Sequence, residues 1–417
     1  MFRLVDTAIV GRLGTQELGG VAVAVSVLSL VIAGSNFLAY GTTQHVSHRR
    51  GAGHAAQAAD TGIQALWAAL AIGVTAAPLL ALWAPQLATV MGANGEIRDI
   101  ASTYLRISAL GVPFVIVGIA AQGVQRGNGD FRSGLIVLVA ANIANAGLEV
   151  LFVFGFDQGV AGAAWSTVIA QTGASVALAW RTVAHLVAAP RCRPAWSEMG
   201  PLLTAGRHLV LRTASILAVF TGATAVAARI DDPTLAAHQI AVSLFLFIAL
   251  SLDALAVPTQ TLVAEELGCD SGNAAHVAAR AQRLSVSVGV GLAVIVAASS
   301  PLLARAFSSD LAVVSRATVA IALLGLVLVP GSAAFGTDGA LIGAGDYRFL
   351  GRAAFAYAVA VLPIAGAVLV APALGIAGIW AGLAIWMLMR SVVNRRRLAM
   401  LLPSRNLVAS AGPNRQE

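Results

Sequence analysis

Lysine is absent from this chain of 417 residues, and charge of either sign is scarce. Only 11% of the residues are charged, whereas a soluble globular protein carries roughly 25%. Together with a hydrophobic content of 58%, this shortage of charge excludes a soluble globular protein, because such a chain would aggregate in water. All 26 basic residues are Arg and lie mainly in short breaks between apolar runs, so the net charge of +7 does not indicate a nucleic-acid partner.

Cysteine is nearly absent too, and so are the motifs of several functional classes. The two cysteines, Cys192 and Cys269, fall in loops predicted to face the cytoplasm, which indicates reduced thiols rather than a disulfide framework. The chain lacks a Gly-x-x-x-x-Gly-Lys-Ser/Thr motif, which excludes an ATP-driven pump. Its seven His residues do not cluster at metal-ligand spacing. We therefore expect no enzyme and no cofactor, and a protein that is passive or driven by an ion gradient.

What the chain does contain is a series of apolar runs of roughly 18 to 25 residues, each long enough to cross a bilayer. The fold class predicted from them is an all-α integral membrane protein without a separate soluble domain. Eleven complete spans are predicted, at residues 17–45, 57–83, 99–124, 132–154, 160–184, 204–230, 233–264, 282–304, 313–342, 350–371 and 375–398.

Residues 1–11 form a further apolar piece. It is too short to cross a bilayer of about 30 Å at a rise of about 1.5 Å per residue. We interpret it as the C-terminal half of a first helix, which brings the number of helices to twelve. A misassigned start codon that removed roughly 15 to 20 residues explains the missing half, and a real truncation is the alternative.

The sequence repeats itself after half its length, which is typical of transporters built from two similar bundles. The predicted fold is therefore two six-helix bundles, related by a pseudo-two-fold axis along the membrane normal because six spans return the chain to the same side. The predicted domains are an N-terminal lobe at 1–186, a linker at 187–203, a C-terminal lobe at 204–402 and a disordered tail at 403–417. Three matching pairs lie 216 or 217 positions apart: 127–132 with 343–348, 18–26 with 235–243, and 159–162 with 375–378.

Arginine is distributed unequally between alternate loops, and this predicts the orientation. One set of loops carries eighteen Arg residues and the other carries four, namely Arg12, Arg98, Arg229 and Arg305. Because loops rich in basic residues stay on the cytoplasmic side, the first set and both termini are predicted to face the cytoplasm. The predicted location is the cell inner membrane, as a multi-pass protein and a monomer.

Polar residues within the N-terminal spans point to a site. Asn142, Asn145 and Glu149 are spaced by three and four residues, so they lie on one helical stripe. Two amides and a carboxyl suit a proton or a small cation, although interhelical hydrogen bonding is the structural alternative. Asp6 follows Arg3 by three residues, which fits either an ion pair near a helix end or a buried carboxyl that loads and releases a proton.

The second half of the chain also has polar residues within a span. Gln239, Ser243 and Asp253 lie in the span at 233–264, and fourteen residues place Gln239 and Asp253 on one face. With Asn142 they are our candidates for a substrate cavity. A neutralised structural role for Asp253 is the alternative.

Other charged residues are interpreted as structural. Asp338 lies near the end of its helix, and Arg106 and Arg212 are within snorkelling distance of an interface. Asp130 and Asp346 occupy the repeated loop, where each is expected to cap the next helix.

Several segments resemble those of one transporter family. Residues 4–14, LVDTAIVGRLG, are similar to the first-helix motif of the multidrug and toxic compound extrusion (MATE) transporters. Residues 235–240, 252–256 and 338–346 resemble its DinF-type prokaryotic branch, and the similarity covers about residues 4–400. The resemblance implies two six-helix lobes around a central cavity that opens alternately to each side. It also implies antiport, in which an organic, often cationic, molecule leaves as protons or sodium ions enter.

The resemblance further implies a cation site in the N-terminal lobe. Asp6 matches the family's first-helix Asp, Asn145 and Glu149 match its fifth-helix pair, and Thr167 falls at the expected sixth-helix position. The family's fifth-helix acid is commonly Asp. The extra methylene of Glu disfavours sodium coordination more than proton carriage.

We therefore expect an antiporter, coupled to H+ or Na+, that exports organic, cationic drugs or toxic metabolites across the inner membrane by alternating access. One rival is a lipid-linked saccharide flippase of the wider superfamily, which would line its cavity with basic residues, whereas the groups inside these spans are mainly acidic. The other rival is an inactive truncated remnant or scaffold, suggested by the short first helix.

Overall fold

The computed structural model describes residues 9–185 and 193–403. The chain forms two compact units. The first comprises Met1–Arg50 and His54–Gly206, and the second comprises Gly51–Gly53 and Arg207–Glu417. The border falls inside one long helix, and the predicted linker and tail lie partly outside the described residues, so those boundaries stay predictions.

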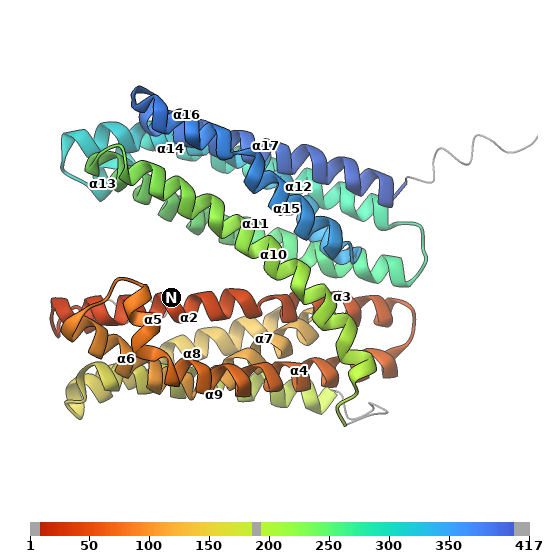
Figure 1. The fold of residues 1–417 in the computed structure, drawn as a ribbon. Helices are drawn as coiled ribbons and strands as arrows, with labels where there is room; N and C mark the ends of the chain where they lie inside the picture. Colours follow the sequence, from red (N-terminus) through yellow and green to blue (C-terminus); the bar gives the residue numbers. More distant parts are fainter. Residues whose placement is uncertain (1–8, 186–192, 404–417) are drawn as a thin grey trace, which may run out of the picture. The chain divides into compact units, whose positions relative to one another are not determined.

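In the described residues of the first unit, every regular element is a helix (Figure 1). The long helix α10, Trp196–Ala228, begins in this unit and continues into the second. The other helices of the first unit are α2 (Thr15–Ser35), α3 (Phe37–Gly51), α4 (Ala55–Leu82), α5 (Ala84–Val90), α6 (Gly95–Ala109), α7 (Val112–Gly127), α8 (Arg132–Val150), the π-helical turn η1 (Leu151–Gly155) and α9 (Gly159–His185).

The described part of the second unit is likewise helical, and α14 is packed against α11, α12 and α17. Besides α10, its helices are α11 (Asp232–Gly268), α12 (Ala274–Ala298), α13 (Ser300–Phe307), α14 (Leu311–Gly343), α15 (Tyr347–Ala360), α16 (Leu362–Val370), the 3-10 turn η2 (Pro372–Leu374) and α17 (Gly375–Leu401).

The predicted membrane spans correspond to helices of the structure. Within the described ranges, nine helices are long and apolar enough to cross a membrane, and α6 with α7 forms a tenth span that is bent by 55°. The bend follows from Gly111 and from Pro113, whose nitrogen has no hydrogen to donate. The eleventh predicted span, 160–184, is α9, which is 27 residues long but has no stretch of 18 residues as apolar as those of the other spans.

Some boundaries differ from the prediction for identifiable reasons. The predicted span 282–304 begins eight residues earlier, at Ala274, and is interrupted after Ala298, because Pro301 starts the separate helix α13. The predicted span 350–371 is divided between α15 and α16 at Val361, just before Pro363.

The sequence repeat is visible in the turns. Gly129 and Gly345 follow α7 and α14 with φ values of 79° and 74°, and Gly159 and Gly375 are the first residues of α9 and α17 with φ values of 53° and 49°. These left-handed conformations favour glycine, because a side chain would clash with its own backbone. Matching backbone geometry at matching positions supports two equivalent halves.

Each half also contains the same close helix crossing. A Cβ atom on Gly123 of α7 would lie 2.8 Å from the carbonyl oxygen of Ala39, and one on Gly339 of α14 would lie 2.4 Å from that of Ala256. Gly127 and Gly343, four residues later, approach their partner helices as closely. Gly-x-x-x-Gly spacing allows membrane helices to approach each other in this way.

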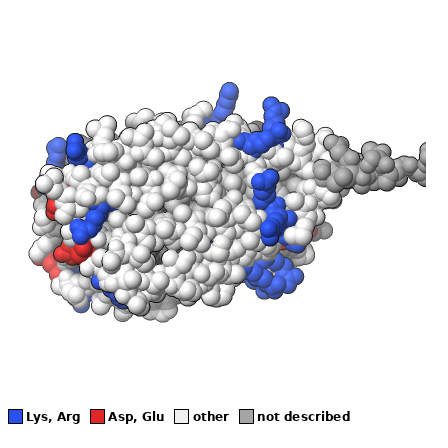
Figure 2. All heavy atoms as spheres, turned by 90° about the horizontal axis from the view of Figure 1, so that it is seen from above, with Lys and Arg blue, Asp and Glu red and all other residues white. Residues whose placement is uncertain are grey.

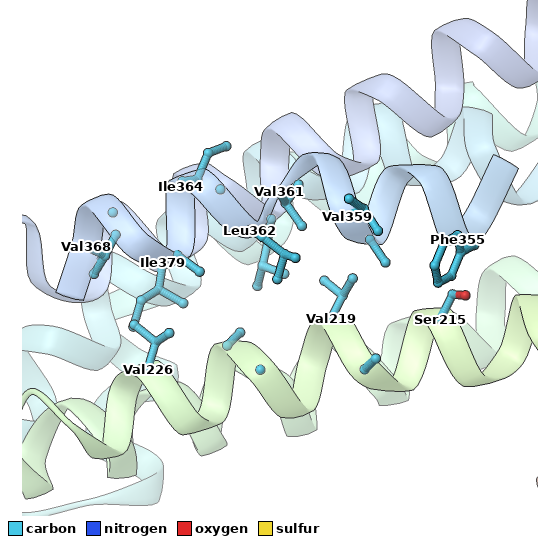
Figure 3. A pocket seen from close by; sticks show the side chains of 18 of the residues that line it. Ser215, Val219, Val226, Phe355, Val359, Val361, Leu362, Ile364, Val368 and Ile379 are labelled. Carbon is cyan, nitrogen blue, oxygen red and sulfur yellow. The ribbon is translucent and has the colours of Figure 1, made fainter. Parts of the chain in front are cut away.

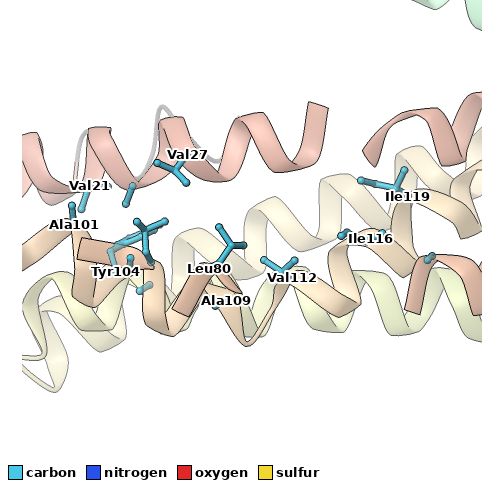
Figure 4. Packing of buried hydrophobic residues seen from close by; sticks show 14 of the residues in the cluster. Val21, Val27, Leu80, Ala101, Tyr104, Ala109, Val112, Ile116 and Ile119 are labelled. Atoms are coloured by element: carbon cyan, nitrogen blue, oxygen red, sulfur yellow. The ribbon is translucent and has the colours of Figure 1, made fainter. Parts of the chain in front are cut away.

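The surface and the cores fit a membrane protein. On the face shown in Figure 2, uncharged residues cover the middle, and the charged residues gather toward the two ends. Inside the first unit, Tyr104 of α6 packs among apolar residues of α2 and α7, including Val27 and Val112 (Figure 4). A separate core in the second unit surrounds Trp380 and Trp386 of α17.

Candidate functional site

Helix α8 has a narrow buried stripe that contains two of the predicted site residues. Most of the helix is exposed or half-buried, whereas Ala141, Asn145 and Glu149, spaced by four residues, are buried. Asn145 and Glu149 are both 0% exposed, and both carboxyl oxygens of Glu149 are shielded. The spacing therefore brings an amide and a carboxyl together one helical turn apart, in the interior of the lobe.

The helix changes its geometry directly after Glu149. Leu151–Gly155 form a π-helical turn, and Gly162 at the start of α9 lies against the backbone of Phe152 in that turn. Single π-helical turns occur frequently at functional sites, because the extra residue widens the helix and redirects the side chains beside it.

Asn142 occupies the edge of the stripe. It is half-buried, and its Nδ2 atom donates a hydrogen bond to the carbonyl oxygen of Leu138 at 2.6 Å. Its buried Oδ1 atom accepts no hydrogen bond from any residue that the structure describes.

A cavity of about 310 Å³ lies within the first unit, between α2, α6, α7 and α9. Thr167 of α9 lines it, and its hydroxyl donates to the carbonyl oxygen of Ala163 at 3.0 Å. Asn145 and Glu149 are not among the residues that line this cavity. Thr167 is therefore placed at a cavity, whereas the other two described residues of the predicted cation site are packed in the interior.

The sequence reasoning missed the other polar residues of this cavity, Ser29, Tyr104, Ser108 and Gln171. The hydroxyl of Ser108 is buried and finds no hydrogen-bond partner in the described ranges. A signal was present, since Tyr104 and Ser108 on α6, and Thr167 and Gln171 on α9, are pairs spaced by four residues. Such pairs place two polar side chains on one face of a span.

The remaining candidates lie elsewhere, and Asp6 lies outside the described residues. Gln239 and Ser243 are exposed on α11 and Asp253 is half-buried, and none of the three lines the cavity of the first unit described above. The hydroxyl of Ser243 donates to the carbonyl oxygen of Gln239 at 2.8 Å. Their role at a substrate cavity stays a prediction.

The second unit has a buried ion network that the sequence did not reveal. Asp338 of α14 accepts hydrogen bonds from Arg212 of α10, from Arg390 of α17 at 2.8 Å and from Asn394 at 2.6 Å. Asn394 in turn accepts from the Tyr357 hydroxyl at 3.0 Å. Snorkelling of Arg212 is therefore wrong as a prediction, because its side chain pairs with an acid in the interior of the lobe instead.

The two loop aspartates differ in their contacts. The carboxylate of Asp130 accepts hydrogen bonds from the backbone nitrogens of Ser133 and Arg132 at 2.9 and 3.1 Å, which confirms the predicted cap. Hydrogen bonds from Ser133 hold the pKa of Asp130 below its ordinary value. The predicted cap by Asp346 is wrong: its carboxylate makes no cap hydrogen bond to α15 and instead accepts one from Nε of Arg397 at 2.6 Å.

The buried carboxyl in the first unit limits what this site can bind. A carboxyl that is buried in an apolar lobe is costly as a free ion, so it gains from a proton or a cation. No group of three His, Cys, Asp or Glu side chains within the described ranges is placed to hold a metal ion. The amide and carboxyl oxygens of Asn145 and Glu149, one turn apart on α8, are groups that can take up a proton or a small cation.

Comparisons with known proteins agree with this architecture. The MatE family model matches residues 1–151 and 209–367. The chain is 32% identical over 419 residues to "Protein DETOXIFICATION 44, chloroplastic" of Arabidopsis thaliana, a match that covers 95% of this chain and 78% of that protein. It is 29% identical over 276 residues to "DNA damage-inducible protein F" of Escherichia coli (strain K12), covering 65% and 60%.

A solved structure has the same fold. It is described as the outward-facing conformation of a multidrug resistance MATE family transporter of the MOP superfamily. The TM-score is 0.86 at 21% sequence identity, and the match covers 96% of this chain and 92% of that chain.

Proposed function

Because this chain belongs to the MatE family, we propose that it is an ion-coupled antiporter that exports organic, cationic molecules across the cell inner membrane by alternating access. The family makes the chain a multi-pass membrane transporter of small organic molecules rather than an enzyme. The MATE resemblance seen in the sequence is confirmed. The coupling ion, the charge of the cargo and the residues that carry the coupling belong to our proposal.

The proposed coupling site consists of Asp6, Asn145, Glu149 and Thr167. The burial of Asn145 and Glu149, one turn apart on a membrane helix, is the observation that carries it. Loading of a proton or sodium ion there removes the cost of a buried charge and changes the packing of α8 around its π-helical turn. That repacking lowers the affinity for cargo, and by linkage cargo and ion weaken each other's binding.

Efflux of a cationic dye from everted or whole cells tests the site through Glu149→Gln. This change keeps the size of the side chain but removes its charge, so we expect gradient-driven efflux to fall at least about tenfold, which corresponds to about 1.4 kcal/mol of lost coupling. Glu149→Asp keeps the carboxyl and should retain part of the activity. Glu96→Gln makes the same chemical change at an exposed position and should leave efflux intact.

The coupling ion is decided in the same assay. The longer Glu side chain favours proton carriage, so we expect dye efflux to persist in sodium-free buffer and to stop when the pH gradient is collapsed. Efflux by Glu149→Gln at the wild-type rate, with equal protein in the membrane, would show that the proposed site is wrong. Loss of efflux in sodium-free buffer would instead assign the coupling to sodium.

A further inference from the structure

The second unit contains a cavity of about 420 Å³ between α10, α15, α16 and α17 (Figure 3). Its lining is apolar, with Val219 and Val226 on α10 facing Val359 and Val368 across the space. Ser215 is the one lining residue with a polar side-chain group, and its hydroxyl donates to a backbone carbonyl of its own helix at 2.7 Å. A cavity of this kind stays dry and accepts apolar groups.

This cavity occupies the place that the polar stripe has in the first repeat. The residues 216 positions after the predicted polar site line it, so the second repeat carries alkyl groups where the first carries amides, a carboxyl and a hydroxyl. The four pairs are Asn142 with Ala358, Asn145 with Val361, Glu149 with Ala365, and Thr167 with Leu383. The second site therefore suits an apolar ligand and not an ion.

The cavity opens among exposed apolar side chains. Leu211, Phe355 and Leu362 line it and are 37%, 54% and 62% exposed. In a membrane-spanning unit, an apolar rim on the outer surface of the helices meets acyl chains rather than water.

A basic cluster lies directly beside one end of the cavity. Arg207 precedes the lining residue Leu211 by one turn of α10, and Arg352 precedes Phe355 by one turn of α15. The two helices approach closely here, since a Cβ atom on Gly351 would lie 2.6 Å from the carbonyl oxygen of His208.

The charges in this cluster are all of one sign. Arg207, Arg348 and Arg352 are exposed, and all three act electrostatically on His208. None of the three arginines forms an ion pair with another of the residues that the structure describes. Three cations without acidic partners favour an external anion.

We propose that this site binds an anionic phospholipid of the bilayer. The phosphate lies at Arg207, Arg348 and Arg352, and one acyl chain enters the cavity between α10 and α15. The basic cluster and the apolar cavity adjoin along both helices, which matches the order of headgroup and chain in a lipid. A free anion would leave the cavity unused, and a neutral lipid would leave the three arginines without a counter-charge.

Native mass spectrometry of the full chain, purified in a neutral detergent, tests the proposal with phosphatidylglycerol and phosphatidylcholine as probes. We expect phosphatidylglycerol to bind at least tenfold more tightly. Arg348→Gln with Arg352→Gln should weaken its binding roughly thirtyfold, since each cation near a headgroup contributes about 1 kcal/mol. Gly222→Phe should prevent binding of both lipids, because Gly222 lines the cavity and a Cβ there meets open space.

Matched variants provide the controls. Arg395→Gln with Arg396→Gln removes two exposed charges from the end of α17, and Gly291→Phe adds a ring at a glycine whose Cβ also meets open space but which lies outside the cavity. Both should bind phosphatidylglycerol like the wild type. The proposal would be overturned if the two lipids bound equally, or if each test variant had the same effect as its control. It would also be overturned if inorganic phosphate alone displaced phosphatidylglycerol.

Discussion

Asp338 shows how a single residue can hold a membrane lobe together. Its carboxylate is bound by two guanidiniums and one amide, which come from α10 and α17. Arg390 also stacks on the ring of Trp386 at 4.9 Å. Removing one partner from a buried ion pair costs far more than the pair itself contributes, because the remaining charge is left in a medium of low dielectric constant.

We therefore expect Asp338→Asn to lower the free energy of unfolding by about 3 to 5 kcal/mol. Unfolding in mixed detergent micelles, followed by tryptophan fluorescence, measures this loss. Asp99→Asn breaks an exposed pair with Arg98 and should cost less than about 1 kcal/mol. Adding Arg390→Met to Asp338→Asn should recover part of the stability, because it removes the unpaired charge. Equal losses of stability for Asp338→Asn and Asp99→Asn would contradict the interpretation.

The sequence predicted individual residues well where their partners are local. The cap at Asp130 depends on residues two and three positions away. Arg212 pairs with an acid 126 positions away, and the bond of Asp346 to Arg397 spans 51 positions. Tertiary pairing of this kind leaves no periodic pattern in the sequence, which therefore predicted snorkelling for Arg212 and a helix cap for Asp346.

At the scale of helices, glycine crossings set the distance between neighbours. Gly123 and Gly339 occupy the same position in the two repeats, and each faces the backbone of a partner helix. Backbone atoms cannot rotate away as a side chain can, so a methyl group at either position forces the helices apart.

Gly123→Ala and Gly339→Ala should each destabilise the protein by about 1 to 3 kcal/mol. Gly173→Ala and Gly291→Ala are the controls, because a Cβ at these positions meets nothing within 4 Å. These controls should be neutral or stabilising by up to about 1 kcal/mol, since Ala favours helix over Gly. The same unfolding experiment in mixed micelles measures all four variants. A loss of stability at Gly123 and Gly339, with no loss at Gly173 and Gly291, would show that crowding against the partner helix outweighs the higher helix propensity of Ala.

The helices could be predicted from the lengths of the apolar runs, whereas the points at which a span is divided into two helices could not. The short helices α5 and α13 and the division of one span at Val361 depend on prolines inside apolar runs. Proline also stands inside α4, α10, α11 and α14 without ending them. Proline alone therefore does not decide between a continuous and a broken span, because neighbouring helices decide how the freed carbonyl is satisfied.

For the whole molecule, the distribution of arginine predicts which loops face the cytoplasm. Cys269 is exposed in a loop predicted to lie inside the cell, and Ser309 is exposed in a loop predicted to lie outside. In a Cys192→Ser background, a membrane-impermeant maleimide should label Cys269 in everted vesicles and not in whole cells. With Cys269→Ser and Ser309→Cys the pattern should be reversed. The same labelling from both sides would contradict the predicted orientation.

The ion network of the second unit has a mechanical consequence. One carboxylate joins α10, α14 and α17, and Tyr357 extends the network to α15 through Asn394. Helices joined by a shared buried carboxylate are expected to move together. If one of them moved alone, the ion pair would break and leave an unpaired charge in a medium of low dielectric constant. We therefore expect the second unit to move as one body during transport, and any helix bending to occur in the first unit, at the π-helical turn that follows Glu149.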